Sequence, residues 1–65
     1  MTYYKSNDDR NPDIFCEQTG QRWEKTSKNQ YRKIPIGTYF IYLDALKKKH
    51  QVTKITEEEF FLELL

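Results

Sequence analysis

The chain has 65 residues, of which 37% are hydrophobic and 32% charged, and 11 basic side chains nearly balance 10 acidic ones. A chain of this length makes one domain and buries only about 60% of the surface that its unfolded form exposes, so we expect marginal stability. The net charge of +1 argues against a general nucleic-acid binder, which is typically far more basic, and the single cysteine, Cys16, excludes an internal disulfide.

A lone thiol is typical of a protein from a reducing compartment. The first 12 residues are polar and contain no apolar segment of the kind found in signal peptides. No stretch approaches the roughly 20 apolar residues that a membrane-spanning helix needs. We therefore expect a soluble cytoplasmic protein that does not enter a membrane, and the start at Met1 suggests an intact small protein.

Residues 1–12 are predicted to form a flexible N-terminal arm, and residues 13–65 a single small domain. Most positions from Ser6 to Pro12 are turn formers or poor strand formers. Tyr3 and Tyr4 are exceptions. Either one ring lies on the domain and the other is exposed to solvent, or the two rings form a short aromatic contact site for a partner.

Residues 13–25 are predicted to form a β-hairpin around Thr19 and Gly20. A two-residue loop would ask Thr19 for a positive φ, which a β-branched residue resists. A three-residue loop needs only Gly20 in the left-handed region. It also creates cross-strand pairs worth about 0.2–1 kcal/mol each, so we favour this register. The pairs are Phe15 with Trp23 and Asp13 with Lys25.

Residues 31–36 resume an extended pattern, with Tyr31 and Lys33 expected on the opposite side from Arg32. Pro35 cannot donate to a sheet ladder, so this segment is predicted to be either a third strand at the edge of the sheet or the end of such a strand.

Residues 38–49 fit two structures. As a helix they place Tyr39, Tyr42, Leu43 and Leu46 on one stripe, with Thr38 as N-cap. As a strand, residues 38–43 have the β-branched and aromatic side chains that sheets prefer. We favour a continuous helix. In either case both faces of residues 39–43 are apolar, so this segment is expected to be the most buried, unless one face is an interface.

Residues 50–55 are interpreted as a connection, and residues 56–65 as a second helix. Thr56 followed by Glu59 is the signature of a capping box, and Ile55 with Phe60 that of a hydrophobic staple. The predicted fold class is therefore α+β: an N-terminal β-hairpin with a third edge strand, followed by two helices packed on one face.

Catalysis is not favoured. Nothing in the sequence places Cys16 beside His50, and a packed thiol and a solvated imidazole explain both residues. Residues 57–59 are acidic, but the start of a capped helix explains them without a cation. We therefore expect no enzyme activity, no metal and no cofactor.

Nucleic-acid binding is the alternative function. Basic side chains interleaved with Trp23 and Tyr31 on the predicted sheet could hold phosphates while the rings stack on bases. The acidic second helix argues against a helix-turn-helix. The basic candidates are Arg22, Lys25, Lys28, Arg32 and Lys33.

Protein binding is the favoured function, because the aromatic residues, 15% of the chain, exceed what so small a core needs. Aromatic side chains are also enriched in interface cores. The partner would be another protein or a second copy of the chain, and a small phage-type inhibitor or regulator is the class that this brevity suggests. The candidate partner-binding residues are Trp23, Tyr31, Phe40, Tyr42, Phe61 and Leu65.

Overall fold

The computed structural model describes residues 1–8, 12–26, 30–35 and 37–65. In these ranges the chain forms five strands and two helices, which confirms the predicted α+β class. In chain order the elements are β1 (Tyr3–Ser6), β2 (Ile14–Cys16), β3 (Arg22–Lys25), β4 (Tyr31–Lys33), α1 (Phe40–Lys48), β5 (Val52–Ile55) and α2 (Glu57–Glu63).

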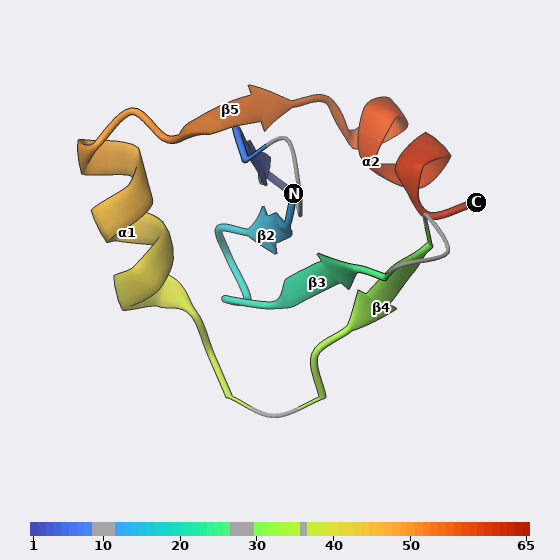
Figure 1. The fold of residues 1–65 in the computed structure, drawn as a ribbon, viewed down its shortest axis with the longest axis horizontal. Coiled ribbons are helices and arrows are strands. Elements are labelled where there is room, and N and C mark those ends of the chain that lie inside the picture. The colour runs from blue at the N-terminus through green and yellow to red at the C-terminus, as the bar shows by residue number, and fades with distance from the viewer. Residues whose placement is uncertain (9–11, 27–29, 36) are drawn as a thin grey trace.

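The strands form one antiparallel sheet in the order β4-β3-β2-β1-β5. The first four strands follow one another as a meander, and after α1 the chain returns so that β5 pairs with β1 (Figure 1). β4 therefore lies at an edge, as the proline after it indicated.

β1 corrects the prediction of an N-terminal arm. Residues 3–6 are a strand between β2 and β5, with Tyr3 opposite Ile55 and Ser6 opposite Val52. Residues 52–55 are likewise a strand and no mere connection. β1 and β5 have four residues each and pair with one another. The local sequence of neither segment indicates this pairing. Residues 9–11 of the predicted arm lie outside the described residues.

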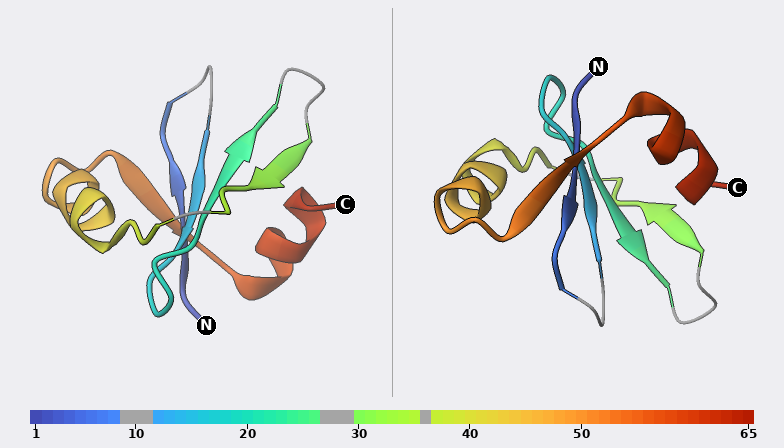
Figure 2. Two further views of the ribbon diagram at one scale, coloured as in Figure 1. Left: turned by 90° about the horizontal axis from the view of Figure 1, so that it is seen from below. Right: turned by 90° about the horizontal axis from the view of Figure 1, so that it is seen from above.

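The two helices cover opposite faces of the sheet, which corrects the prediction that both pack on one face (Figure 2). Side chains alternate between the faces of a strand. Phe15 points to one face, where its ring centroid is 5.7 Å from that of Tyr42 in α1. Ile14 points to the other face and joins a buried cluster with Tyr3 and with Phe60 of α2. All three residues of β2 are buried, and a strand buried on both faces needs a layer on each side.

The hairpin exists, but neither register considered for it is right. Ile14 lies opposite Trp23 and Phe15 opposite Arg22, so the loop holds four residues, 17–20. Gly20 does adopt the expected left-handed backbone, with φ of +71°. A one-residue slip moves a side chain to the other face. Trp23 therefore joins Ile14 on the α2 side, and Arg22 joins Phe15 on the α1 side.

The favoured helix is confirmed within residues 38–49, but α1 covers only Phe40–Lys48. Its N-cap is Tyr39, which makes no side-chain capping bond, so the assignment of Thr38 as N-cap is wrong.

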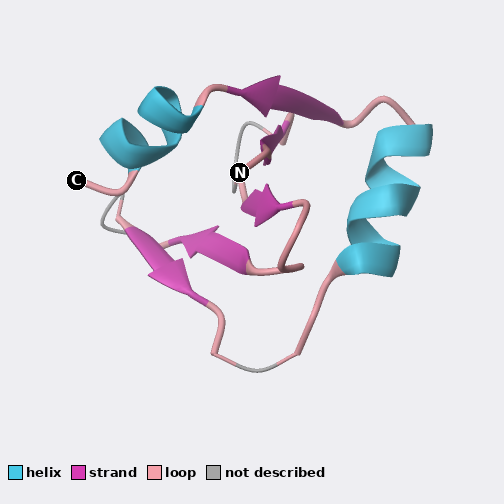
Figure 3. Cartoon of the chain, turned by 180° about the vertical axis from the view of Figure 1, so that it is seen from behind, coloured by secondary structure: helices cyan, strands magenta, loops and turns pink. Residues whose placement is uncertain are grey.

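The capping box of α2 is confirmed, because the Glu59 amide donates to Thr56 Oγ1 at 3.0 Å and the Thr56 amide donates to Glu59 Oε1 at 3.4 Å. Figure 3 shows the two helices at opposite ends of the molecule with the strands between them.

Candidate protein-binding surface

The inner side of α1 is fixed to the sheet by Arg22. Its guanidinium carbon lies 5.1 and 5.2 Å from the ring centroids of Tyr39 and Tyr42, and 5.7 Å from that of Phe15. Arg22 Nε also donates to Asp13 Oδ2 at 3.0 Å. Burial raises the pKa of the Asp13 carboxyl, and the hydrogen bond and charge of Arg22 oppose that shift. Cation–π contacts and an ion pair therefore occupy this arginine.

Lys47 provides a second attachment near the other end of α1. Its Nζ atom donates to Glu17 Oε1 at 2.8 Å and lies 4.9 Å from the ring centroid of Tyr4. The hydrogen bond to Glu17 raises the pKa of Lys47. Together with buried Leu43, these contacts fix which side of α1 faces the sheet.

The outer side of α1 carries a large exposed aliphatic residue. Leu43 is the buried residue of this helix, and Ile41, two positions earlier, is 88% exposed. Successive residues of an α-helix are about 100° apart, so Ile41 points away from the sheet. Exposed side chains at helical spacing continue the same stripe. We call this stripe the α1 outer face: Ile41, Asp44, Ala45, Lys48 and Lys49.

α2 repeats this arrangement on the opposite side of the molecule. Phe60 is its buried residue, stacked on Tyr3 with ring centroids 3.8 Å apart. Leu62, two positions later, is 62% exposed, and Phe61 and Leu65 are exposed beside it. We call this stripe the α2 outer face: Glu58, Phe61, Leu62 and Leu65.

The six predicted partner-binding residues do not form one surface. Phe40 and Tyr42 are half-exposed on α1, where they line a shallow hollow with Ile41 and Ala45. Phe61 and Leu65 lie at α2, across the sheet. Trp23 and Tyr31 pack against the buried cluster around Phe60.

Sequence reasoning missed the most exposed aliphatic residue within each helix, which is Ile41 in α1 and Leu62 in α2. The signal that could have found them is helical phase. Each lies two positions, or about 200°, from the one buried residue of its helix. The sequence shows apolar residues all round both helices, so the phase becomes readable only when the buried residue is known.

The basic side chains of the alternative function have partners at several positions. Arg22 is held by Asp13 as described, Arg32 Nη2 donates to Glu24 Oε1 at 2.7 Å, and Lys25 Nζ lies 5.8 Å from the ring centroid of Tyr31. Lys33 is exposed on β4. Lys28 lies outside the described residues.

The described residues also show where the reactive side chains lie. Cys16 is buried in β2, and His50 is exposed two residues after the end of α1, with φ of +56°. Within the described ranges no three His, Cys, Asp or Glu side chains gather as a metal site would require.

No family model, curated protein or solved structure matches the chain. In the part of the chain that the structure describes, neither helix has the length and apolar character needed to cross a bilayer.

Proposed function

We propose that the chain is a non-enzymatic protein-binding module that makes its contacts through the outer faces of its two helices. The observation that carries this proposal is the exposure of Ile41 and Leu62, each about 200° around its helix from the residue that is buried. Single exposed apolar residues are ordinary on a protein surface. On α2, however, Leu62 is joined by Phe61 and Leu65, and grouped apolar residues are typical of interaction sites.

The two attachments of α1 support the same proposal. A helix that needed its apolar residues only for folding would turn them toward the sheet. Here Arg22 and Lys47 hold the inner side in place, and Ile41 remains outside. The exposed aliphatic surface is thus part of a fixed helix, which suits a preformed binding surface.

In this proposal the module is a small inhibitor or regulator of the phage type, which acts on a larger protein simply by binding to it. Nucleic-acid binding through Arg22, Arg32 and Lys33 stays a prediction that the structure does not favour. Two of these three side chains already form ion pairs with carboxylates.

The test is a capture experiment with the tagged full chain in lysate of its source cells, run with and without nuclease. We expect a protein, or further copies of the chain, to be retained in stoichiometric amount whether or not nuclease is present. Capture that disappears with nuclease would replace the proposal with the nucleic-acid alternative. Capture of neither protein nor nucleic acid would reject both.

A further inference from the structure

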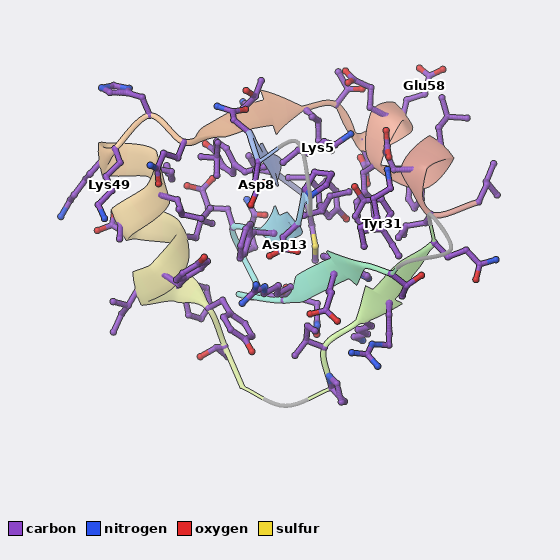
Figure 4. The ribbon with its side chains drawn as sticks, viewed as in Figure 1. Lys5, Asp8, Asp13, Tyr31, Lys49 and Glu58 are labelled. Atoms are coloured by element: carbon purple, nitrogen blue, oxygen red, sulfur yellow. The ribbon has the colours of Figure 1, made fainter. Side chains whose placement is uncertain are left out.

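The charges and apolar residues of the two outer faces are arranged in opposite order along the chain. The α1 outer face begins with Ile41, continues with Asp44 and Ala45, and ends with two lysines, Lys48 and Lys49. The α2 outer face begins with Glu58 and ends with its apolar residues. Lys49 and Glu58 lie on opposite sides of the molecule, beside α1 and α2 respectively (Figure 4).

These two faces are complementary when the helices lie antiparallel. The distance along the axis from Ile41 to Lys48 is about 10 Å, and the same number of residues separates Glu58 from Leu65. Apolar residues would then meet apolar residues at one end, and lysines would meet Glu58 at the other. Antiparallel helices also bring the negative end of each dipole beside the positive end of the other.

The local ion pairs leave these charges available. Lys48 Nζ lies 3.1 Å from Asp44 Oδ2, but both side chains are largely exposed, so that pair contributes little. Glu57, the acidic neighbour of Glu58, lies 3.9 Å from the N-terminal amine, again at an exposed position. Either contact can be exchanged for one with a partner.

We propose that the partner is a second copy of this chain, with the α1 outer face of one molecule packed antiparallel on the α2 outer face of the next. This inference rests on the proposed protein-binding function and names the occupant of both faces. Charge complementarity carries it, because the lysines at the end of the α1 outer face would meet Glu58 at the start of the α2 outer face.

The arrangement dictates the kind of assembly. The two faces differ and lie on opposite sides of the sheet, so each contact leaves a free α1 outer face on one molecule and a free α2 outer face on the other. Such a heterologous contact extends to an open chain or closes to a ring, and does not stop at a dimer. The helices are short, with nine and seven residues. We therefore expect association that depends on concentration and weakens with salt.

The test measures molar mass by light scattering or sedimentation over a concentration series, for wild type and two variants. Ile41→Glu disables the α1 outer face and Leu62→Glu the α2 outer face, and both positions are exposed enough to accept the change. We expect the wild-type mass to rise beyond that of a dimer and each variant alone to remain monomeric. An equimolar mixture of the variants should give a dimer, since it restores one intact contact and blocks further growth.

Gln30→Glu is the matched control, because it adds the same charge at an exposed position outside both faces. It should associate like wild type. Circular dichroism and urea unfolding verify that each variant is folded, and the more conservative Ile41→Ser and Leu62→Ser replace any that is not. The inference is overturned if wild type is monomeric throughout or if the mixture stays monomeric. A wild-type monomer that still captures a different protein from lysate would overturn this inference and leave the proposed function standing.

Discussion

At the scale of single residues, Gly20 connects the hairpin to α1. Its carbonyl oxygen accepts a hydrogen bond from the Tyr39 amide at 2.8 Å. A Cβ atom at Gly20 would lie 2.9 Å from Cε2 of Phe40, which is closer than packed atoms allow. The missing side chain therefore lets the first turn of α1 sit on the loop.

Gly20→Ala should destabilise the domain for two separable reasons. A left-handed alanine costs about 1–2 kcal/mol, and the new methyl group must also displace the Phe40 ring. In a Phe40→Ala background only the first cost remains, so the loss of unfolding free energy should be smaller. Urea denaturation of the four proteins measures this coupling.

Gly37 provides the control for that cycle. It also has a positive φ, +92°, but a Cβ atom added there would have no neighbouring atom within 4 Å. Gly37→Ala should therefore show no coupling to Phe40→Ala. Equal losses for Gly20→Ala in both backgrounds would refute the steric explanation.

Tyr31 has a buried hydroxyl that makes no hydrogen bond to the described residues. An unpaired buried polar group costs about 1–3 kcal/mol. Tyr31→Phe should therefore leave the free energy of unfolding at neutral pH unchanged or raise it by up to that amount. Thermal or urea unfolding measures the difference, and a clear loss of stability would show that the hydroxyl has a partner.

The same hydroxyl gives a dependence on pH. Burial, followed by the negative charges of Glu63 and Asp13, raises the pKa of Tyr31 from 10.0 to about 12. The folded pKa lies above the unfolded one, so the stability that neutral Tyr31 contributes is complete below pH 10 and is lost as the pH rises toward 12. Wild type should lose stability more steeply than Tyr31→Phe across this range. Parallel slopes would contradict the shift.

At the scale of elements, α2 shows what a short segment can encode alone. Its capping box lies within four consecutive residues, Thr56 to Glu59, and the sequence predicted it correctly. β1 and β5 show the opposite case. They are adjacent in the sheet but about 50 residues apart in the chain, so the pairing that makes them strands is not local.

Two neighbouring phenylalanines of α2 should respond very differently to truncation. Phe60 is buried against Tyr3 and Trp23, and Phe60→Ala should cost about 3–5 kcal/mol. Phe61 is 57% exposed, so Phe61→Ala should change stability by no more than about 0.5 kcal/mol. Urea unfolding of the two variants compares them directly, and similar losses would contradict the assigned face of α2.

At the scale of the whole molecule, the sequence indicated the α+β class, the edge position of β4 and an excess of apolar residues. It did not indicate that the helices lie on opposite faces, because that depends on β2 being covered on both sides. The excess was read as one aromatic surface, but Trp23 and Tyr31 pack inward. Ile41 and Leu62 lie outermost because tertiary contacts buried Leu43 and Phe60.

We propose that the outer faces of α1 and α2 bind protein. This proposal is tested by capture from nuclease-treated lysate, with tagged wild type and the Ile41→Glu, Leu62→Glu double variant side by side. We expect wild type to retain its protein partner, or further copies of itself, and the folded double variant to lose it. Equal retention by both proteins would show that binding uses another surface.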